Sequence, residues 1–214
     1  MPFDRSQLLL YAITDRGCIG QRDFFDAIEQ ALRGGITILQ LREKGAGEAA
    51  LIETAKRVKK LCAAYSVPLI VNDNYRAALA AGADGVHVGI EDASVAEIRR
   101  AAGEGFIIGA TAKTVAQAQR AEAEGADYLG VGAVFPSPTK TNAIRITPEQ
   151  FREIKASVQI PAVAIGGISL ENLPQLAPLH ADGFAVVSAV FAAEDITARC
   201  KMLKQTAAET ASAE

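Results

Sequence analysis

The segment Ile36-Thr37-Ile38-Leu39-Gln40-Leu41-Arg42-Glu43-Lys44 holds the pattern that decides the fold. It starts as a short apolar run, which is typical of a buried strand, and then becomes polar. Side chains alternate between the two faces of a strand, so we predict that Gln40 and Arg42 share the face of Ile38 and that Lys44 follows them. Burying an unpaired Arg is costly. The segment therefore predicts either a strand with an anion bound at its C-terminal end or an ordinary strand that enters a solvated charged loop.

The rest of the chain repeats this strand pattern, each time followed by a helical pattern. Besides the quoted segment, apolar runs predict strands at 8–13, 68–73, 85–89, 106–111, 128–135, 161–168 and 184–190. Capped or amphipathic segments predict helices at 23–32, 48–65, 75–81, 94–102, 115–124 and 195–204, and two more that start near Thr147 and Ser169.

These eight strand–helix units recur about every 25 residues, and their continuously apolar strands imply a parallel sheet buried on both faces. We therefore predict an α/β fold with one domain, a (β/α)8 TIM barrel over residues 1–204. An open doubly wound sheet is the alternative. The last residues, 205–214, are expected to form a disordered tail.

The composition is that of a soluble protein with one sizeable core. The chain has 214 residues, of which 50% are hydrophobic, with a net charge of −3 and a pI of about 5.5. No global basic charge indicates nucleic acid or an anionic membrane as a partner. The cysteines Cys18, Cys62 and Cys200 lack a CxxC spacing and are expected to be reduced thiols of a cytoplasmic protein. No signal peptide or membrane-spanning run is predicted, and a homo-oligomer is left open.

Polar residues gather where the predicted strands end, which is the end of a TIM barrel that carries chemistry. Asp73 and Asp92 end adjacent strands, and two carboxylates beside substrate phosphates suit Mg²⁺. Each also has a structural interpretation, Asp92 as the N-cap of the next helix and Asp73 as a turn residue. The full set of polar and glycine positions is Gln40, Arg42, Lys44, Asn72, Asp73, Asp92, Thr111, Ser137, Thr139, Lys140, Gly166, Gly167 and Ser188.

Two groups of these residues suit anions. Arg42, Lys44 and Lys140 would surround a diphosphate, although each could also be a solvated surface charge. Gly166-Gly167, together with Val187-Ser188 in the next strand, suit a phosphate monoester bound by backbone N–H groups near the start of a helix. Tight turns are the alternative explanation for the glycines.

General acid–base and covalent catalysis lack obvious candidates. The predicted strands contain no Lys for a Schiff base, and the chain has no nucleophile elbow. Of the two histidines, His87 is expected to be a hydrogen-bonded structural residue and His180 a loop residue. A metal-assisted departure of diphosphate needs no such group.

In their order and spacing, these motifs resemble those of the thiamine-phosphate synthase family over nearly the whole chain. The resemblance rests on Gln40-Leu41-Arg42-Glu43-Lys44, Asn72-Asp73, Gly85-Val86-His87-Val88-Gly89 with Glu91-Asp92, Val134-Phe135-Pro136-Ser137-Pro138-Thr139-Lys140, and Ala164-Ile165-Gly166-Gly167-Ile168. It implies a transferase of thiamine biosynthesis that joins hydroxymethylpyrimidine diphosphate to thiazole phosphate, with Mg²⁺ as cofactor. A thiazole tautomerase relative and a non-catalytic phosphate-ligand sensor are the alternatives.

The resemblance also implies a role for each site residue. Mg²⁺ would be held by Asp73 and Asp92, and the pyrimidine would contact Gln40. Catalytic roles would fall to Arg42, Lys44, Lys140 and Thr111, the last of which stands where the family usually has Ser. Substrate-binding residues would be Arg42, Lys44, Asn72 and Lys140 at the diphosphate, and Ser137, Thr139, Gly167, Val187 and Ser188 at the thiazole phosphate and reacting groups.

Several positions at the predicted rim depart from the family pattern. Ile90 stands where Gln is usual, Ala112-Lys113 where Thr-His is common, and Asn142 where Asp is common. Members of the tautomerase group are expected to use a histidine near position 113. The lysine there therefore favours the synthase over that alternative.

Overall fold

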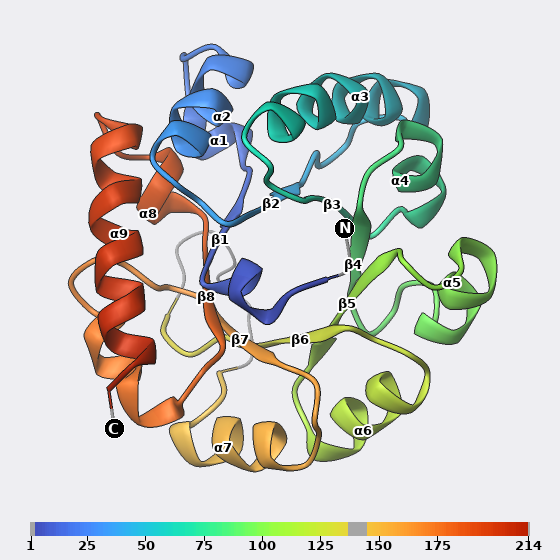
Figure 1. Ribbon diagram of the computed structural model, residues 1–214, viewed down its shortest axis with the longest axis vertical. Helices are drawn as coiled ribbons and strands as arrows, with labels where there is room; N and C mark the ends of the chain where they lie inside the picture. The colour runs from blue at the N-terminus through green and yellow to red at the C-terminus, as the bar shows by residue number, and fades with distance from the viewer. Residues whose placement is uncertain (1–2, 137–144, 214) are drawn as a thin grey trace.

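Eight short aliphatic segments form the parallel strands of a closed barrel, in which β8 closes against β1 (Figure 1). The computed structural model describes residues 3–136 and 145–213. The predicted TIM barrel is confirmed, and the open doubly wound sheet is wrong because the pairing of β1 with β8 leaves no open edge. The strands are β1 (Leu10–Ile13), β2 (Ile38–Leu41), β3 (Leu69–Asn72), β4 (Gly85–Val88), β5 (Ile107–Ala112), β6 (Tyr128–Gly132), β7 (Ala162–Ile165) and β8 (Gly183–Val186).

Helices connect the strands and surround the barrel. Side-chain caps begin many of them: Ser94 accepts the N–H of Glu97 at the start of α5, and Thr147 forms a capping box at the start of α7. The helices are η1 (Arg5–Leu8), α1 (Arg16–Ile19), α2 (Phe24–Arg33), α3 (Glu48–Ala64), α4 (Tyr75–Ala81), α5 (Val95–Ala102), α6 (Val115–Ala123), α7 (Pro148–Ala156), η2 (Leu173–Leu179), α8 (Ser188–Phe191) and α9 (Ile196–Ala211), where η denotes a 3-10 helix.

Two elements predicted after β7 differ from the structure. The helix expected from Ser169 is the later 3-10 helix η2, which contains Pro174 and Pro178. Proline lacks an N–H and interrupts α-helical hydrogen bonding. The strand expected at 184–190 ends at Val186, and Ser188 begins helix α8 instead.

The segment 205–211 is helical, so the prediction of a disordered tail is wrong as far as Ala211. Helix α9 includes this segment, and Leu203, Ala207 and Thr210 on it are buried. Spacings of four and three residues put these side chains on one face of the helix. Helix α9 packs against η2 and α2. Tertiary packing therefore keeps this polar, alanine-rich end ordered.

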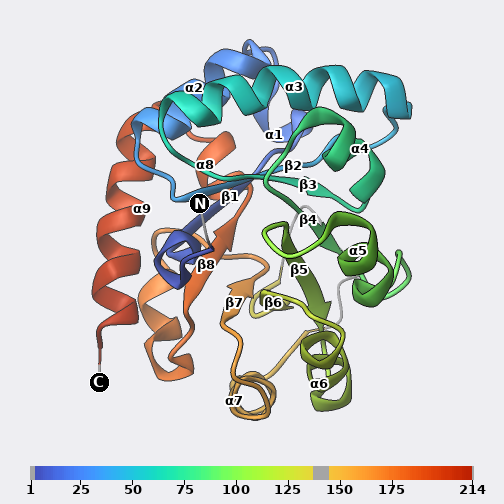
Figure 2. The same cartoon turned by 45° about the vertical axis from the view of Figure 1, so that its right-hand side comes forward.

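The buried side chains form one cluster inside the barrel and another between the barrel and its helices. Tyr11, Ile38 and Tyr128 belong to the inner cluster, whereas Leu39 belongs to the outer one. This division follows from the alternation of side chains along each strand. Helix η1 lies across one opening of the barrel (Figures 1 and 2), where Phe3 stacks on Tyr128 with ring centroids 6.0 Å apart. The barrel is thus closed at the end where its strands start.

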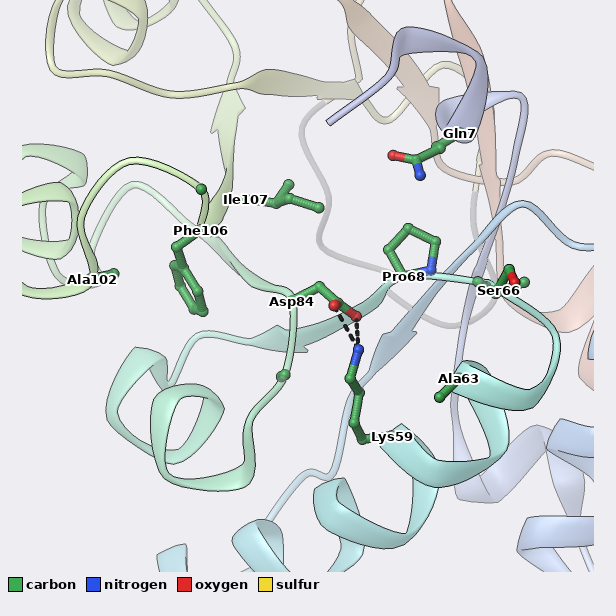
Figure 3. A pocket seen from close by; sticks show the side chains of 12 residues that line it. Gln7, Lys59, Ala63, Ser66, Pro68, Asp84, Ala102, Phe106 and Ile107 are labelled. Atoms are coloured by element: carbon green, nitrogen blue, oxygen red, sulfur yellow. Dashed lines mark hydrogen bonds and ion pairs between the residues drawn. The ribbon is translucent and has the colours of Figure 1, made fainter. Parts of the chain in front are cut away.

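One pattern of contacts recurs at this closed end, before the even-numbered strands. The Asp84 carboxylate accepts the backbone N–H of Leu69 at 2.7 Å, and the Asp84 N–H donates to the Leu69 carbonyl at 2.9 Å. Lys59 of α3 reaches the same carboxylate (Figure 3). We call this arrangement a clasp, because it joins the strands β3 and β4.

Further clasps join β1 to β2, β5 to β6 and β7 to β8. Two repeat the aspartate and the cation, and in the clasp before β2 a threonine replaces the aspartate. The turns Gly82-Ala83-Asp84 and Gly125-Ala126-Asp127, which lead into β4 and β6, are therefore structural. The partners are Asp127 with Ile108 and Arg99, Asp182 with Ala162 and Lys155, and Thr37 with Leu10.

A hollow of about 540 Å³ lies beside the Asp84 clasp (Figure 3). Gln7, Lys59 and Phe106 contribute to its lining. Its walls also include Pro68, which precedes β3, and Ile107, which begins β5. It therefore lies where strands start, away from the polar residues that follow their C-terminal ends.

Candidate active site

Arg42 is held by residues that follow β1. Its guanidinium donates to the Asp15 carboxylate at 3.0 Å, and its backbone N–H donates to Thr14 Oγ1 at 2.9 Å. Thr14 is fully buried, and only 14% of the Arg42 side chain is exposed. Arg42 is therefore an ordered, paired cation and no solvated surface charge. A guanidinium that uses one nitrogen for a carboxylate keeps further N–H groups for an anion.

Lys44 is placed differently from Arg42. It lies in the turn after β2, and its side chain is exposed. The neighbouring Glu43 pairs with Arg16 at 2.7 Å, which ties the same loop to α1. The alternative of a solvated charge stays open for Lys44.

Asn72 and Asp73 stand together at the C-terminal end of β3. Asn72 is the last residue of the strand and pairs in register with His87 of β4. Asp73 has a left-handed backbone with φ of 64°, and its N–H donates to the His87 carbonyl at 2.8 Å. The turn predicted at Asp73 is present, and it joins the ends of β3 and β4.

Asp92 belongs to the loop after β4. Its carboxylate accepts the backbone N–H of Gly89 at 2.7 Å, and the side chain is exposed. Ser94 caps helix α5, so the interpretation of Asp92 as that helix cap is wrong. Its position after the strand that neighbours Asp73 agrees with the predicted geometry.

The two carboxylates fit a hard cation by their chemistry. Mg²⁺ in proteins takes one or two carboxylates and completes its shell with water and phosphate oxygens. Within residues 3–136 and 145–213, no group of three or more His, Cys, Asp or Glu side chains could hold a metal ion. A metal ion held by Asp73 and Asp92 would need further ligands, such as water or phosphate oxygens.

Gly166 and Gly167 lie where the loop after β7 approaches the loop after β6. The Phe135 N–H donates to the Gly166 carbonyl at 3.0 Å, and a Cβ on Gly167 would come within 2.8 Å of Phe135 Cβ. Gly167 also has φ of 64°, which side chains rarely adopt. Close backbone contact and a left-handed turn therefore explain both glycines, as the turn alternative proposed. Binding of a phosphate at the same turn is compatible with this packing.

Helix α8 carries the other half of the predicted phosphate site. Val187 is its N-cap and Ser188 its first residue, so both lie directly after β8. Arg22 secures the far end of α8, because its guanidinium donates to the carbonyls of Phe191 and Ala193. It also donates to the carbonyls of Cys18 and Ile19 at the end of α1. One arginine thereby connects the helices that follow β1 and β8.

Thr111 and Gln40 lie inside the barrel and are joined through other polar side chains. Gln40 donates to the Tyr11 hydroxyl at 2.8 Å, and Thr111 Oγ1 lies 3.1 Å from His87 Nε2. Tyr11 and His87 both contact the Tyr128 hydroxyl. The hydrogen-bonded role expected for His87 is confirmed. Burial raises the pKa of Tyr128 and of Tyr11 well above the usual range, so both hydroxyls keep their protons.

Several predicted site positions lie outside the described residues or away from the contacts above. Ser137, Thr139, Lys140 and the divergent Asn142 fall within 137–144, outside the part that the structure describes. Ile90 is 52% exposed after β4, and the Lys113 N–H donates to Gln117 at the start of α6.

Sequence reasoning missed the residues that support this rim. Asp15 and Thr14 hold Arg42, and their signal was the polar Thr14-Asp15 pair directly after the first apolar run. Arg22 and the two tyrosines carried no comparable signal, because their partners are distant in the sequence.

Comparison with known proteins identifies the family. A family model described as thiamine monophosphate synthase matches residues 10–190. The chain belongs to this family. A thiamine-phosphate synthase from Clostridium tetani is 42% identical to it over 91% of this chain and 93% of that protein. The same enzyme from Alkaliphilus oremlandii is 43% identical over 91% of this chain and 93% of that protein.

A solved structure agrees with the family match. Thiamine phosphate pyrophosphorylase from Pyrococcus furiosus is 38% identical, with a TM-score of 0.88 over 96% of this chain and 98% of that one. The predicted family and fold are thus confirmed, and the chain is a transferase of thiamine biosynthesis. These relatives do not favour the tautomerase and sensor alternatives. In the described part of the chain, no helix has the length and apolar character needed to cross a bilayer.

Proposed function

We propose that the chain joins 4-amino-5-hydroxymethyl-2-methylpyrimidine diphosphate to 4-methyl-5-(2-phosphoethyl)thiazole, or its carboxylated form, to give thiamine phosphate and diphosphate. The observation that supports this proposal is that the candidate anion-binding residues fall into two groups at the C-terminal ends of the strands. Arg42, Asn72 and Asp73 follow or end β2 and β3. Gly167 and Ser188 follow β7 and β8. Two anionic substrates could therefore meet over the mouth of one barrel.

The first half would hold the diphosphate. Arg42 is already oriented by Asp15, so little side-chain entropy would be lost when it binds phosphate oxygens. Asn72 would donate from its amide, and Lys44 and Lys140 would add positive charge. Each of these contacts would strengthen as negative charge builds up on the departing diphosphate, which is the requirement for catalysis.

Asp73 and Asp92 would hold Mg²⁺ beside the same group. When bound, the ion neutralises charge on the diphosphate. Asp73 would be well suited to this task, because its left-handed backbone is fixed by the hydrogen bond to His87 of the neighbouring strand.

The pyrimidine would lie between Gln40 and Thr111 above the interior of the barrel. The bond between the exocyclic carbon and the diphosphate oxygen would break, with both electrons leaving on the oxygen. The amino group of the ring would stabilise the resulting cation. The thiazole nitrogen would then form the new bond with its lone pair. That nitrogen carries no proton, so the reaction needs no general base.

The second half would hold the thiazole phosphate. Backbone N–H groups near Gly167 and Val187, with the Ser188 hydroxyl, would bind its oxygens. Ser137 and Thr139 would approach the thiazole from the loop after β6. Holding both substrates in contact would supply much of the rate acceleration. We also propose that the enzyme works in the cytoplasm, in keeping with its three free thiols.

Product formation tests the proposal directly. The purified full-length protein would be incubated with both substrates, with and without Mg²⁺, and thiamine phosphate would be measured as thiochrome fluorescence after oxidation. We expect product only when Mg²⁺ is present. Isomerised thiazole without coupling would identify a tautomerase, and saturable binding of thiazole phosphate without turnover would identify a sensor. Either of these results would overturn the proposal.

A further inference from the structure

Five polar side chains form a continuous row through the interior of the barrel. Gln40 Nε2 lies 2.8 Å from the Tyr11 hydroxyl, which lies 2.7 Å from the Tyr128 hydroxyl. The Tyr128 hydroxyl lies 3.1 Å from His87 Nδ1, and His87 Nε2 lies 3.1 Å from Thr111 Oγ1. The row begins and ends at residues near the C-terminal ends of β2 and β5. It therefore connects positions on β2 and β5, two strands that β3 and β4 separate.

Two glycines make room for this row. A Cβ on Gly109 would collide with the Tyr128 ring and lie within 2.5 Å of His87 Nδ1. A Cβ on Gly130 would lie 2.9 Å from His87 Cε1. Glycine inside a strand weakens it and often marks a close approach of another group. The barrel thus leaves space on β5 and β6 that the tyrosine and histidine side chains fill.

With the Gln40 NH₂ group as a donor to Tyr11, the other donors and acceptors in the row follow one direction. Both tyrosine hydroxyls are protonated, and each can donate one hydrogen bond. Because Gln40 donates to Tyr11, the Tyr11 proton goes to Tyr128, and the Tyr128 proton goes to His87 Nδ1. His87 Nδ1 is then an acceptor, so its ring carries the proton on Nε2 and donates it to Thr111. In the reverse direction, the Tyr11 proton would need the amide oxygen of Gln40 in place of its NH₂ group.

We propose that this row is a positioning device that sets the hydrogen-bonding pattern met by the ring of the pyrimidine substrate. Gln40 uses its NH₂ group for Tyr11 and so turns its amide oxygen away, as an acceptor for an amino group. Thr111 accepts from His87 and therefore turns its own proton elsewhere, as a donor for a ring nitrogen. The ligand class is an amino-substituted aromatic nitrogen heterocycle. This inference rests on the proposed function and assigns positioning roles to Tyr11, Tyr128 and His87.

The proton position on His87 can be measured without any substrate. The chain has two histidines, and His180→Asn removes the exposed one at a left-handed position that Asn tolerates. In ¹⁵N-histidine-labelled protein we expect the ring proton of His87 on Nε2. In Tyr128→Phe, the Nδ1 resonance should move toward that of a ring nitrogen without a hydrogen bond. A proton on Nδ1, or no change in Tyr128→Phe, would overturn the inference.

Kinetics then test whether the row acts through Thr111. We expect Tyr128→Phe and Thr111→Val each to lower kcat/KM for the pyrimidine diphosphate by about tenfold. The double variant should lose far less than the product of the two effects, because both changes break one row. Thr111→Ser, which keeps the hydroxyl, should retain activity within about twofold. Losses that multiply fully in the double variant would contradict a shared row.

Two controls separate the different explanations. Tyr65→Phe removes a hydroxyl that bonds to Glu29 outside the barrel, and it should leave kinetics and the His87 resonances unchanged. If Tyr128→Phe fails to fold, as judged by circular dichroism, Thr111→Val alone must still shift the Nε2 resonance. A wild-type protein without turnover but with the Nε2 proton would overturn the proposed function and leave the row intact.

Discussion

Asp73 turns the backbone at the rim and is also a proposed metal ligand there. Its left-handed conformation turns the chain after β3, and its N–H bonds to the neighbouring strand. Asp and Asn adopt this conformation more readily than other residues with side chains. A change from Asp to Asn therefore removes the charge while the turn is retained.

We predict that Asp73→Asn lowers kcat/KM by at least about a hundredfold and weakens the dependence on Mg²⁺, because one of two ligand carboxylates is lost. Product would be measured by thiochrome fluorescence across a Mg²⁺ titration. Asp26→Asn on the outer helix α2 is the matched control and should behave as wild type. A fully active Asp73→Asn enzyme with the original Mg²⁺ response would refute the metal assignment.

At the scale of elements, Arg22 links the helices after β1 and β8. Its guanidinium bonds to carbonyls at the ends of both α1 and α8, which a lysine with a single ammonium group cannot reproduce. The N-terminal residues of α8 are those proposed to bind the thiazole phosphate. Their position at the rim thus depends on a contact at the far end of the helix.

We predict that Arg22→Lys raises KM for thiazole phosphate by about tenfold and leaves KM for the pyrimidine diphosphate nearly unchanged. Steady-state kinetics with each substrate varied in turn would measure the two values. Arg33→Lys, which changes a surface arginine paired with Glu29, is the control. Equal effects on both substrates would indicate general loosening of the fold instead.

The clasps also link separate elements, the neighbouring strands of the barrel, and we expect them to stabilise the folded state. Asp182 is the most buried of the three clasp aspartates, with 9% of its side chain exposed, and it bonds to Ala162 and Lys155. We predict that Asp182→Asn lowers the free energy of unfolding by about 2 kcal/mol, because Lys155 loses its charged partner. Chemical denaturation would measure this. Glu53→Gln, in an exposed pair with Lys56, should cause no measurable change. Equal stability of both variants would contradict the role of the clasp.

At the scale of the whole molecule, the closed barrel buries groups that ionise at high pH. Burial raises the pKa of the thiols of Cys62 and Cys200 to about 12, and raises those of Tyr11 and Tyr128. The unfolded chain would release these protons first, near pH 9 for the thiols and pH 10 for the phenols. The unfolded state would therefore bind fewer protons than the folded state above about pH 9.

It follows that the contribution of these four groups to the stability of the barrel is constant below about pH 8 and falls as pH rises above about 9, until the raised pKa values of the folded state are passed. Denaturation curves at pH 8, 9.5 and 11 would show this fall. Tyr128→Phe should reduce the part of the slope that begins near pH 10, whereas Tyr65→Phe should not. A flat profile up to pH 11 would contradict this account.

Much of the architecture was predictable because it depends on local patterns. Apolar runs and caps such as Ser94 and Thr147 each act within a few residues. The C-terminal end of α9 and the early stop of β8 were not predictable in this way, since packing partners elsewhere in the chain decide both. In the proposed site, local motifs predicted the residue types at the rim, whereas the contacts that hold Arg42 and α8 involve distant parts of the chain.

The sequence by itself determined the barrel, the family and the residue types at the rim, because strand periodicity and motif order are properties of neighbouring residues. Only the tertiary structure decided that Asp15 orients Arg42, that Arg22 secures α8, and that Tyr11 and Tyr128 connect Gln40 to Thr111. These contacts join strands and helices far apart in the chain. They exist only once the barrel has closed and brought β1 beside β8.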